Sequence, residues 1–153
     1  RIETTGGDFD YYRQGISPAV ARILEEMDAE RVAVARALGV PARSAREWLG
    51  EAYGAEGETL LEAVHSNESY AGIKAPSTLD HRYLFEDVPA SLVPIASLGE
   101  HLGIPVPTIK SVIHLASVMH GVDYWSLGRT VDRLGLKALC PEGIRRLAIE
   151  GVS

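Results

Sequence analysis

The chain has little of what marks several large protein classes. Among its 153 residues Cys140 is the only cysteine, which excludes an internal disulfide and a multi-cysteine metal site. Only 7% of the residues are aromatic, so the core must consist of Leu, Val, Ile and Ala. No apolar run approaches the roughly 20 residues that cross a bilayer, and no signal peptide opens the sequence. We therefore expect a cytoplasmic protein without a membrane partner.

Basic clusters and nucleotide-binding motifs are also missing. The formal net charge is −6, and phosphate backbones need a clustered basic face, so we expect no nucleic-acid partner. Neither a GxGxxG fingerprint nor a GxxxxGK[ST] loop occurs, which argues against a self-sufficient nucleotide enzyme. The 5 histidines never stand at metal-ligand spacing with a neighbouring acid on one helix face. We assign them structural roles and expect no metal site.

What the sequence does have is helical periodicity, interrupted by proline and glycine. Ser17 and Pro18 predict the start of a helix that ends at Gly39, because Ser caps free amides and Pro is favoured at the first position. Further helices are predicted over 44–53, 59–66, 88–102, 109–119, 123–134 and 141–149, with a kink at Pro94. Short strands are conceivable only in the extended lead-in, 1–15, and near Ile73. The prediction is an all-α fold, a compact bundle of about seven helices forming one domain over 1–153.

Apolar side chains at helical spacing predict the inward faces of two of these helices. The first helix carries such a face, and the helix over 109–119 carries a longer stripe. Their members are Val20, Ile23, Leu24 and Met27 in the first, and Ile109, Val112, Ile113, Ala116 and Met119 in the second.

The stretch from Leu79 to Pro89 is the densest in reactive groups. Asp87 stands at a predicted helix start, where a carboxylate caps free amides, and it is close enough in sequence to form a local ion pair with Arg82. Alternatively, Arg82 binds a substrate carboxylate through two parallel hydrogen bonds while Asp87 orients a general acid or base. The residues alone leave both interpretations open. The preceding loop, from Asn67 to Asp80, is longer than compact domains usually keep without a functional reason.

Several segments together resemble the helical domain of the opine (octopine/nopaline-type) dehydrogenase family. The resemblance covers roughly residues 9 to 136, and the combination is specific although each piece alone is weak. The segments are Tyr11–Val20, Asp28–Arg31, Ala37–Val40, His81–Pro89, Leu92–Gly99 and Gly128–Thr130.

The resemblance implies a fold and an activity. Members of this family pair an N-terminal Rossmann domain, which binds NAD or NADP, with a C-terminal helical domain. They condense the amine of an amino acid with an α-keto acid and reduce the resulting imine. By resemblance, this chain is the substrate-binding and catalytic helical domain, and its partners are both substrates, its own N-terminal Rossmann domain and a second copy in a homodimer.

The resemblance also implies roles for individual residues. Asp87 is the carboxylate that partners the catalytic histidine, Arg82 binds the keto-acid carboxylate, and Tyr12 lines the substrate cleft, which the loop over 67–80 approaches. These roles suit the residue types, because a carboxylate favours imidazolium and a planar guanidinium matches a carboxylate. The family's catalytic histidine and glycine fingerprint lie upstream of this domain, so we expect the isolated chain to be inactive.

Two other functions stay open. The chain is alternatively the helical domain of a related two-domain dehydrogenase that acts on a ready-made hydroxy or keto acid. It is alternatively a non-catalytic dimerisation module, with the stripe from Ile109 to Met119 and an exposed Trp125 as its interface.

Overall fold

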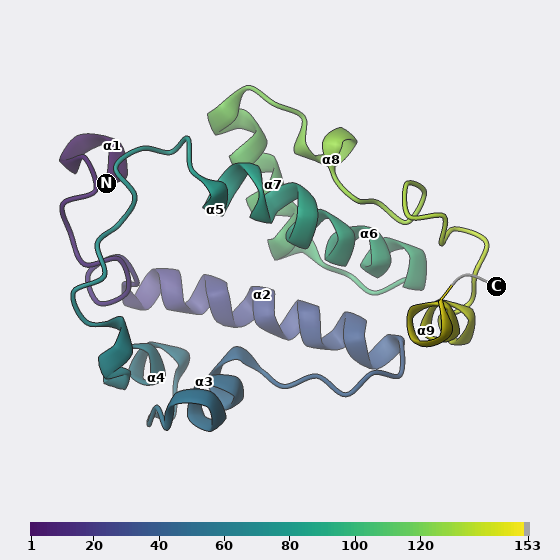
Figure 1. Ribbon diagram of the computed structural model, residues 1–153, viewed down its shortest axis with the longest axis horizontal. Helices are drawn as coiled ribbons and strands as arrows, with labels where there is room; N and C mark the ends of the chain where they lie inside the picture. The colour runs from purple at the N-terminus through teal and green to yellow at the C-terminus, as the bar shows by residue number, and fades with distance from the viewer. Residues whose placement is uncertain (152–153) are drawn as a thin grey trace. The chain divides into compact units, whose positions relative to one another are not determined.

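The computed structural model describes residues 1–151, and within them it contains helices and no named strand (Figure 1). The all-α prediction is therefore confirmed. The two places where a strand was conceivable meet in one isolated antiparallel bridge, between Asp10 and Lys74. No helix of the described part is long and apolar enough to cross a membrane. The chain divides into two compact units, the first comprising 1–29 and 43–81, the second 30–42 and the residues from 82 onward.

The first unit is built around short helices with local caps. It contains α1 (Ile2–Thr5), the first part of α2 (Pro18–Ala37), α3 (Ala45–Tyr53), α4 (Leu60–Ser66) and the 3-10 turn η1 (Glu68–Tyr70). Capping boxes begin α3 at Ser44 and α4 at Thr59, each with a glutamate three residues later reaching back. α3 packs on α4, and their shared core is Leu49, Leu60, Ala63 and Val64.

The second unit is organised around a π-helical turn. It contains the last part of α2, α5 (Arg82–Phe85), the turn η2 (Val88–Leu92), α6 (Val93–Leu102), α7 (Pro107–His120), α8 (Tyr124–Leu127) and α9 (Pro141–Glu150). The turn η2 contacts α5, α6, α7 and α8. Its Val88 and the following Val93 are among the most completely buried side chains of the described residues.

Acidic side chains of α2 cap the two principal helices of the first unit. Glu25 accepts a hydrogen bond from the Leu60 amide at 2.8 Å, and Asp28 accepts one from the Ala45 amide at 2.7 Å. Both donors are the first residue of a helix, where backbone amides have no partner within the helix. A carboxylate also interacts favourably with the positive end of the helix dipole. α2 therefore orients α3 and α4 as well as packing on them.

In the second unit Glu30 of α2 supplies the cap of α7. The local N-cap residue, Val106, makes no side-chain hydrogen bond, and Pro107 has no amide proton. The next two amides, of Thr108 and Ile109, donate to the two oxygens of Glu30 at 2.7 and 2.9 Å. Glu30 is only 6% exposed. This buried carboxylate is therefore fully used by backbone donors from a helix distant in sequence.

The predicted inward face of α2 is partly wrong. Val20 and Ile23 remain 38% and 48% exposed, whereas Ala21, Glu30 and Val34 are buried. The periodicity located the helix correctly but not its orientation. The buried side of α2 includes Glu30, a polar residue that hydrophobic spacing alone assigns to solvent.

Two predicted elements differ from the structure. The lead-in contains the four-residue helix α1, and the helix begun by Asp123 ends at Leu127 rather than at Leu134. Asp123 does cap α8, accepting from the Ser126 amide at 3.1 Å. The helix ends early because of packing. Gly128 lies so close to Val93 that a Cβ atom on Gly128 would stand 2.4 Å from the Val93 side chain. This approach directs the chain away from the helix axis.

The apolar stripe of α7 is only partly an available surface. Ile109, Ile113 and Ala116 are buried within the unit, while Met119 is 54% exposed beside the exposed Leu115 and Val118. Trp125, expected to be exposed, is half-buried. The proposed dimerisation stripe is therefore mostly core.

Candidate functional site

Arg82 and Glu86 form the ion pair of the reactive stretch. The Nε atom of Arg82 lies 3.2 Å from one Glu86 oxygen, and its Nη2 donates to the other at 3.4 Å. The side chains are 63% and 53% exposed. The prediction that Arg82 pairs with Asp87 is thus wrong in its partner, because the spacing of four positions places Glu86 next to Arg82 on a helix.

Asp87 does not cap the helix that follows it. Its backbone is already helical, with φ −68° and ψ −36°, and its side chain makes no cap hydrogen bond. The helical path continues from α5, since the Ala90 amide donates to the Glu86 carbonyl at 3.0 Å. There is no free helix start at this position, so the capping interpretation is wrong. The Asp87 carboxylate stays exposed.

The π turn η2 follows Asp87 directly. The Val93 amide donates to the carbonyl of Val88, five residues back, which leaves the Pro89 carbonyl without a helical partner. That carbonyl accepts instead from the Arg129 amide at 3.0 Å. Single π turns of this kind are frequent at functional sites. Asp87 is therefore a surface carboxylate next to a turn whose Val88 side chain is buried and whose Pro89 carbonyl is hydrogen-bonded to the Arg129 amide.

Tyr12 belongs to the first unit and has a packing role there. Its ring stacks on Tyr70 with centroids 3.9 Å apart and planes at 10°, and meets Tyr11 edge-on at 5.2 Å. Burial, followed by the neighbouring Tyr12 and Tyr53, raises the pKa of Tyr70. Arg82 and Asp87 are both exposed, the first in α5 and the second two residues after its end. Contact of Tyr12 with substrate stays a prediction.

The segment over 67–80 has more order than its sequence indicated. Its Gly72 amide donates to Asp10 at 3.0 Å, and its Ala75 amide donates to the Phe9 carbonyl at 3.1 Å. Backbone hydrogen bonds from Arg13 and Gly72 hold the pKa of Asp10 below its ordinary value. Hydrogen bonds between the lead-in and this segment therefore stabilise both. Sequence reasoning missed this pairing because it joins residues about sixty positions apart.

The described residues form neither a metal site nor a dinucleotide site. No group of three or more His, Cys, Asp and Glu side chains within residues 1–151 is arranged to hold a metal ion. A dinucleotide site needs a strand, a glycine-rich turn and a helix in succession. The described residues have no such strand, and the whole sequence lacks the glycine motif.

Residues 1–120 match the family model described as NAD/NADP octopine/nopaline dehydrogenase, alpha-helical domain. The chain belongs to this family. An opine dehydrogenase of Arthrobacter sp. (strain 1C) is 43% identical over 141 residues, which is 92% of this chain and 39% of that protein. A vitopine synthase of Allorhizobium ampelinum is 32% identical over 131 residues, 86% of this chain and 36% of that protein. The chain thus spans about two-fifths of the length of the curated opine dehydrogenases it matches.

Solved structures of octopine dehydrogenase share the fold of this chain. One, described with NADH and L-arginine, has a TM-score of 0.70 and 24% identity, and covers 86% of this chain and 40% of that chain. A second, described with NADH and agmatine, gives the same values. At this identity the likeness establishes the fold alone.

Proposed function

We propose that this chain is the substrate-binding and catalytic helical domain of an opine-type dehydrogenase, which uses NADH or NADPH to condense an amino acid reductively with an α-keto acid. Family membership carries the proposal. The exposed side chains of Arg82 and Asp87, which lie on the same segment as Glu86, support it. The relatives named for opine and vitopine products support the same reaction class. Assembly as a homodimer stays a prediction.

In this proposal the two residues divide the work. The Arg82 guanidinium has five N–H donors in a planar fork, and Glu86 accepts from two of its nitrogens. A keto-acid carboxylate therefore either displaces Glu86 or binds the remaining donors beside it. The Asp87 carboxylate, which caps nothing, holds a histidine supplied from outside this domain in its protonated form and correct tautomer.

The nicotinamide cofactor belongs elsewhere in the proposed enzyme. This chain's residues do not fit a dinucleotide site, and the relatives are more than twice as long as the matched region. We therefore assign the cofactor to an N-terminal Rossmann domain of the whole protein, and expect residues 1–153 alone to be inactive.

The substrate requirement tests the proposed reaction directly. The whole enzyme is expected to oxidise NADH or NADPH only when an amino acid and an α-keto acid are supplied together, because hydride acceptance needs the imine formed from both. Steady-state absorbance at the nicotinamide band measures this. Continued turnover after the amino acid is omitted would support the alternative, a dehydrogenase of ready-made keto acids, and would refute ours.

Substitutions at Arg82 and Glu86 are expected to shift the KM for the keto acid in opposite directions. Arg82→Lys loses the bidentate geometry and should raise this KM about tenfold or more, since hydrogen bonds to charged groups contribute about 1.5–3 kcal/mol. Glu86→Gln removes a competing carboxylate from an exposed pair worth at most about 1 kcal/mol, and should lower it up to about fivefold.

The KM for the amino acid distinguishes this role from a general loss of structure. It should stay within about twofold in both variants, because the proposed clamp touches only the keto acid. Arg43→Lys, which alters an exposed ion pair with Glu51 in the first unit, is the matched control and should change neither constant. Equal rises in both constants for Arg82→Lys would exclude the clamp.

A further inference from the structure

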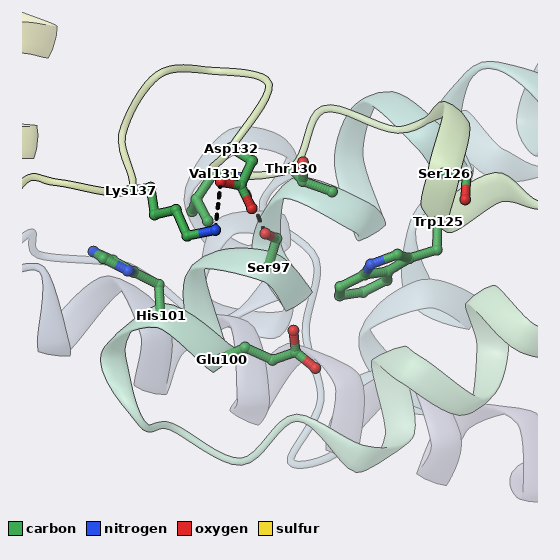
Figure 2. A pocket seen from close by; sticks show the side chains of 9 residues that line it. All are labelled: Ser97, Glu100, His101, Trp125, Ser126, Thr130, Val131, Asp132 and Lys137. Atoms are coloured by element: carbon green, nitrogen blue, oxygen red, sulfur yellow. Dashed lines mark hydrogen bonds and ion pairs between the residues drawn. The ribbon is translucent and has the colours of Figure 1, made fainter.

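The second unit contains an open cavity of about 440 Å³ that none of the predicted site residues lines. Its floor is α6, one wall is α8, and the other is the turn that follows α8 (Figure 2). This volume lies within the range of small-molecule sites in proteins, about 300–1,000 Å³. The size alone admits a ligand, and the chemistry of the lining decides which kind.

Buried contacts hold one wall to the floor and the other wall to α7. The Val131 amide donates to the Ser97 hydroxyl of α6 at 2.9 Å, and both residues are at least nine-tenths buried. Tyr124, the first residue of α8, is 3% exposed, and its hydroxyl lies 2.6 Å from Nδ1 of His120. Buried contacts therefore hold the backbone around the cavity in place.

Two lining residues, Glu100 and Trp125, contact the cation of a residue that is not part of the lining, Lys110. The Lys110 ammonium lies over the indole ring of Trp125, 5.7 Å from its centroid, and forms an ion pair with Glu100. Figure 2 shows the Glu100 carboxylate extending toward the Trp125 ring from the floor. An aromatic face next to a carboxylate is a favourable environment for an ammonium group. Lys110 reaches this place from α7 and is 47% exposed, so its side chain has room to withdraw.

The rest of the lining argues against other ligand classes. Asp132 already pairs with Lys137 at 2.8 Å, so a phosphate would meet Glu100 and Asp132 with no unpaired lysine of the lining to offset them. The Nε2 atom of His101 donates to the Leu139 carbonyl at 2.9 Å, since a carbonyl oxygen only accepts. This ring nitrogen is therefore already engaged and does not offer a donor to a phosphate. Hydroxyl and charged groups line much of the surface, which disfavours an apolar ligand.

We propose that this cavity binds a small primary amine, whose ammonium group takes the place over Trp125 and beside Glu100 that Lys110 occupies. Lys110 then acts as a built-in competitor, and removing its charge strengthens binding of the amine. The proposal is independent of the dehydrogenase reaction, since it concerns only residues of the cavity and its rim.

The two tryptophans of the chain make the test selective. In a ¹H–¹⁵N spectrum of the full chain, Trp125 reports on the cavity, while Trp48 of the first unit is an internal reference; Trp125→Phe assigns the two indole signals. The probes are n-butylamine, n-butanol and butyrate, which share a chain and differ in the head group. We expect n-butylamine alone to shift the Trp125 signal in a saturable way, and Trp48 to stay unchanged.

Two variants fix the position of the ammonium group. Lys110→Met should tighten n-butylamine binding about threefold or more, and Glu100→Gln should weaken it about threefold or more, with folding checked by the dispersion of the spectrum. If the substitutions acted only by disturbing the fold, both variants would bind n-butylamine more weakly. An unchanged or weaker affinity in Lys110→Met overturns the proposal, as does an equal response to n-butanol or butyrate.

Discussion

Asp87→Asn in the whole enzyme is expected to lower kcat/KM by about 10²- to 10⁴-fold, the contribution typical of acid–base catalysis. The substitution keeps the size of the side chain and removes its charge. A neighbouring carboxylate raises the pKa of a histidine, so its loss should lower that pKa. The limb of the pH–rate profile that reports the histidine should therefore move to lower pH, as steady-state rates across pH would measure.

Stability separates this effect from damage to the fold. Asp87 is exposed and makes no cap hydrogen bond, so Asp87→Asn should leave the urea midpoint of unfolding nearly unchanged. Asp8→Asn, which alters an exposed aspartate paired with Lys74, is the matched control and should retain full activity. Activity of Asp87→Asn within about threefold of the wild type would exclude the proposed role.

Glu30→Ala is expected to destabilise the domain by about 2–4 kcal/mol. It removes a buried carboxylate and leaves the amides of Thr108 and Ile109 without acceptors, and hydrogen bonds to charged groups contribute about 1.5–3 kcal/mol. Glu30→Gln keeps one acceptor oxygen but turns an amino group toward a backbone donor, so it should still cost about 1–3 kcal/mol. Urea unfolding at a constant m value measures both.

Other acidic residues of α2 provide a graded comparison. Asp28→Asn and Glu25→Gln each weaken one cap hydrogen bond at a less buried position and should cost about 1 kcal/mol or less. Glu26→Gln changes an exposed residue of the same helix and should stay within about 0.5 kcal/mol. If Glu30→Ala were no more destabilising than Glu26→Gln, the remote cap would contribute nothing.

Local signals located most helices of this domain. Ser17 with Pro18 placed the start of α2, and α3 and α6 end where the ranges 44–53 and 88–102 predicted, each followed by a left-handed glycine, Gly54 and Gly103. These signals work because caps and stops depend on a few neighbouring residues. The length of α8 depended instead on contact between Gly128 and Val93, which are distant in sequence and invisible to such rules.

Sequence reasoning proposed the residues of the candidate site but did not predict their contacts. Sequence reasoning selected Arg82 and Asp87, but one of the two interpretations it left open, an ion pair between them and a helix cap by Asp87, is wrong. Both errors have one origin, because α5 runs almost directly into η2 and no free helix start exists at Asp87. The cavity beside Trp125 was missed, since its residues come from α6, α8 and a later turn.

The remote cap of α7 also bears on the order of folding. Glu30 and its two donors are separated by 78 and 79 positions, so their contact requires closing a long loop of chain. Until that loop closes, α7 begins at a proline with no local side-chain cap. Contacts of such high sequence separation slow folding. We therefore expect the N-terminal turn of α7, which Glu30 stabilises in the folded domain, to form late in folding.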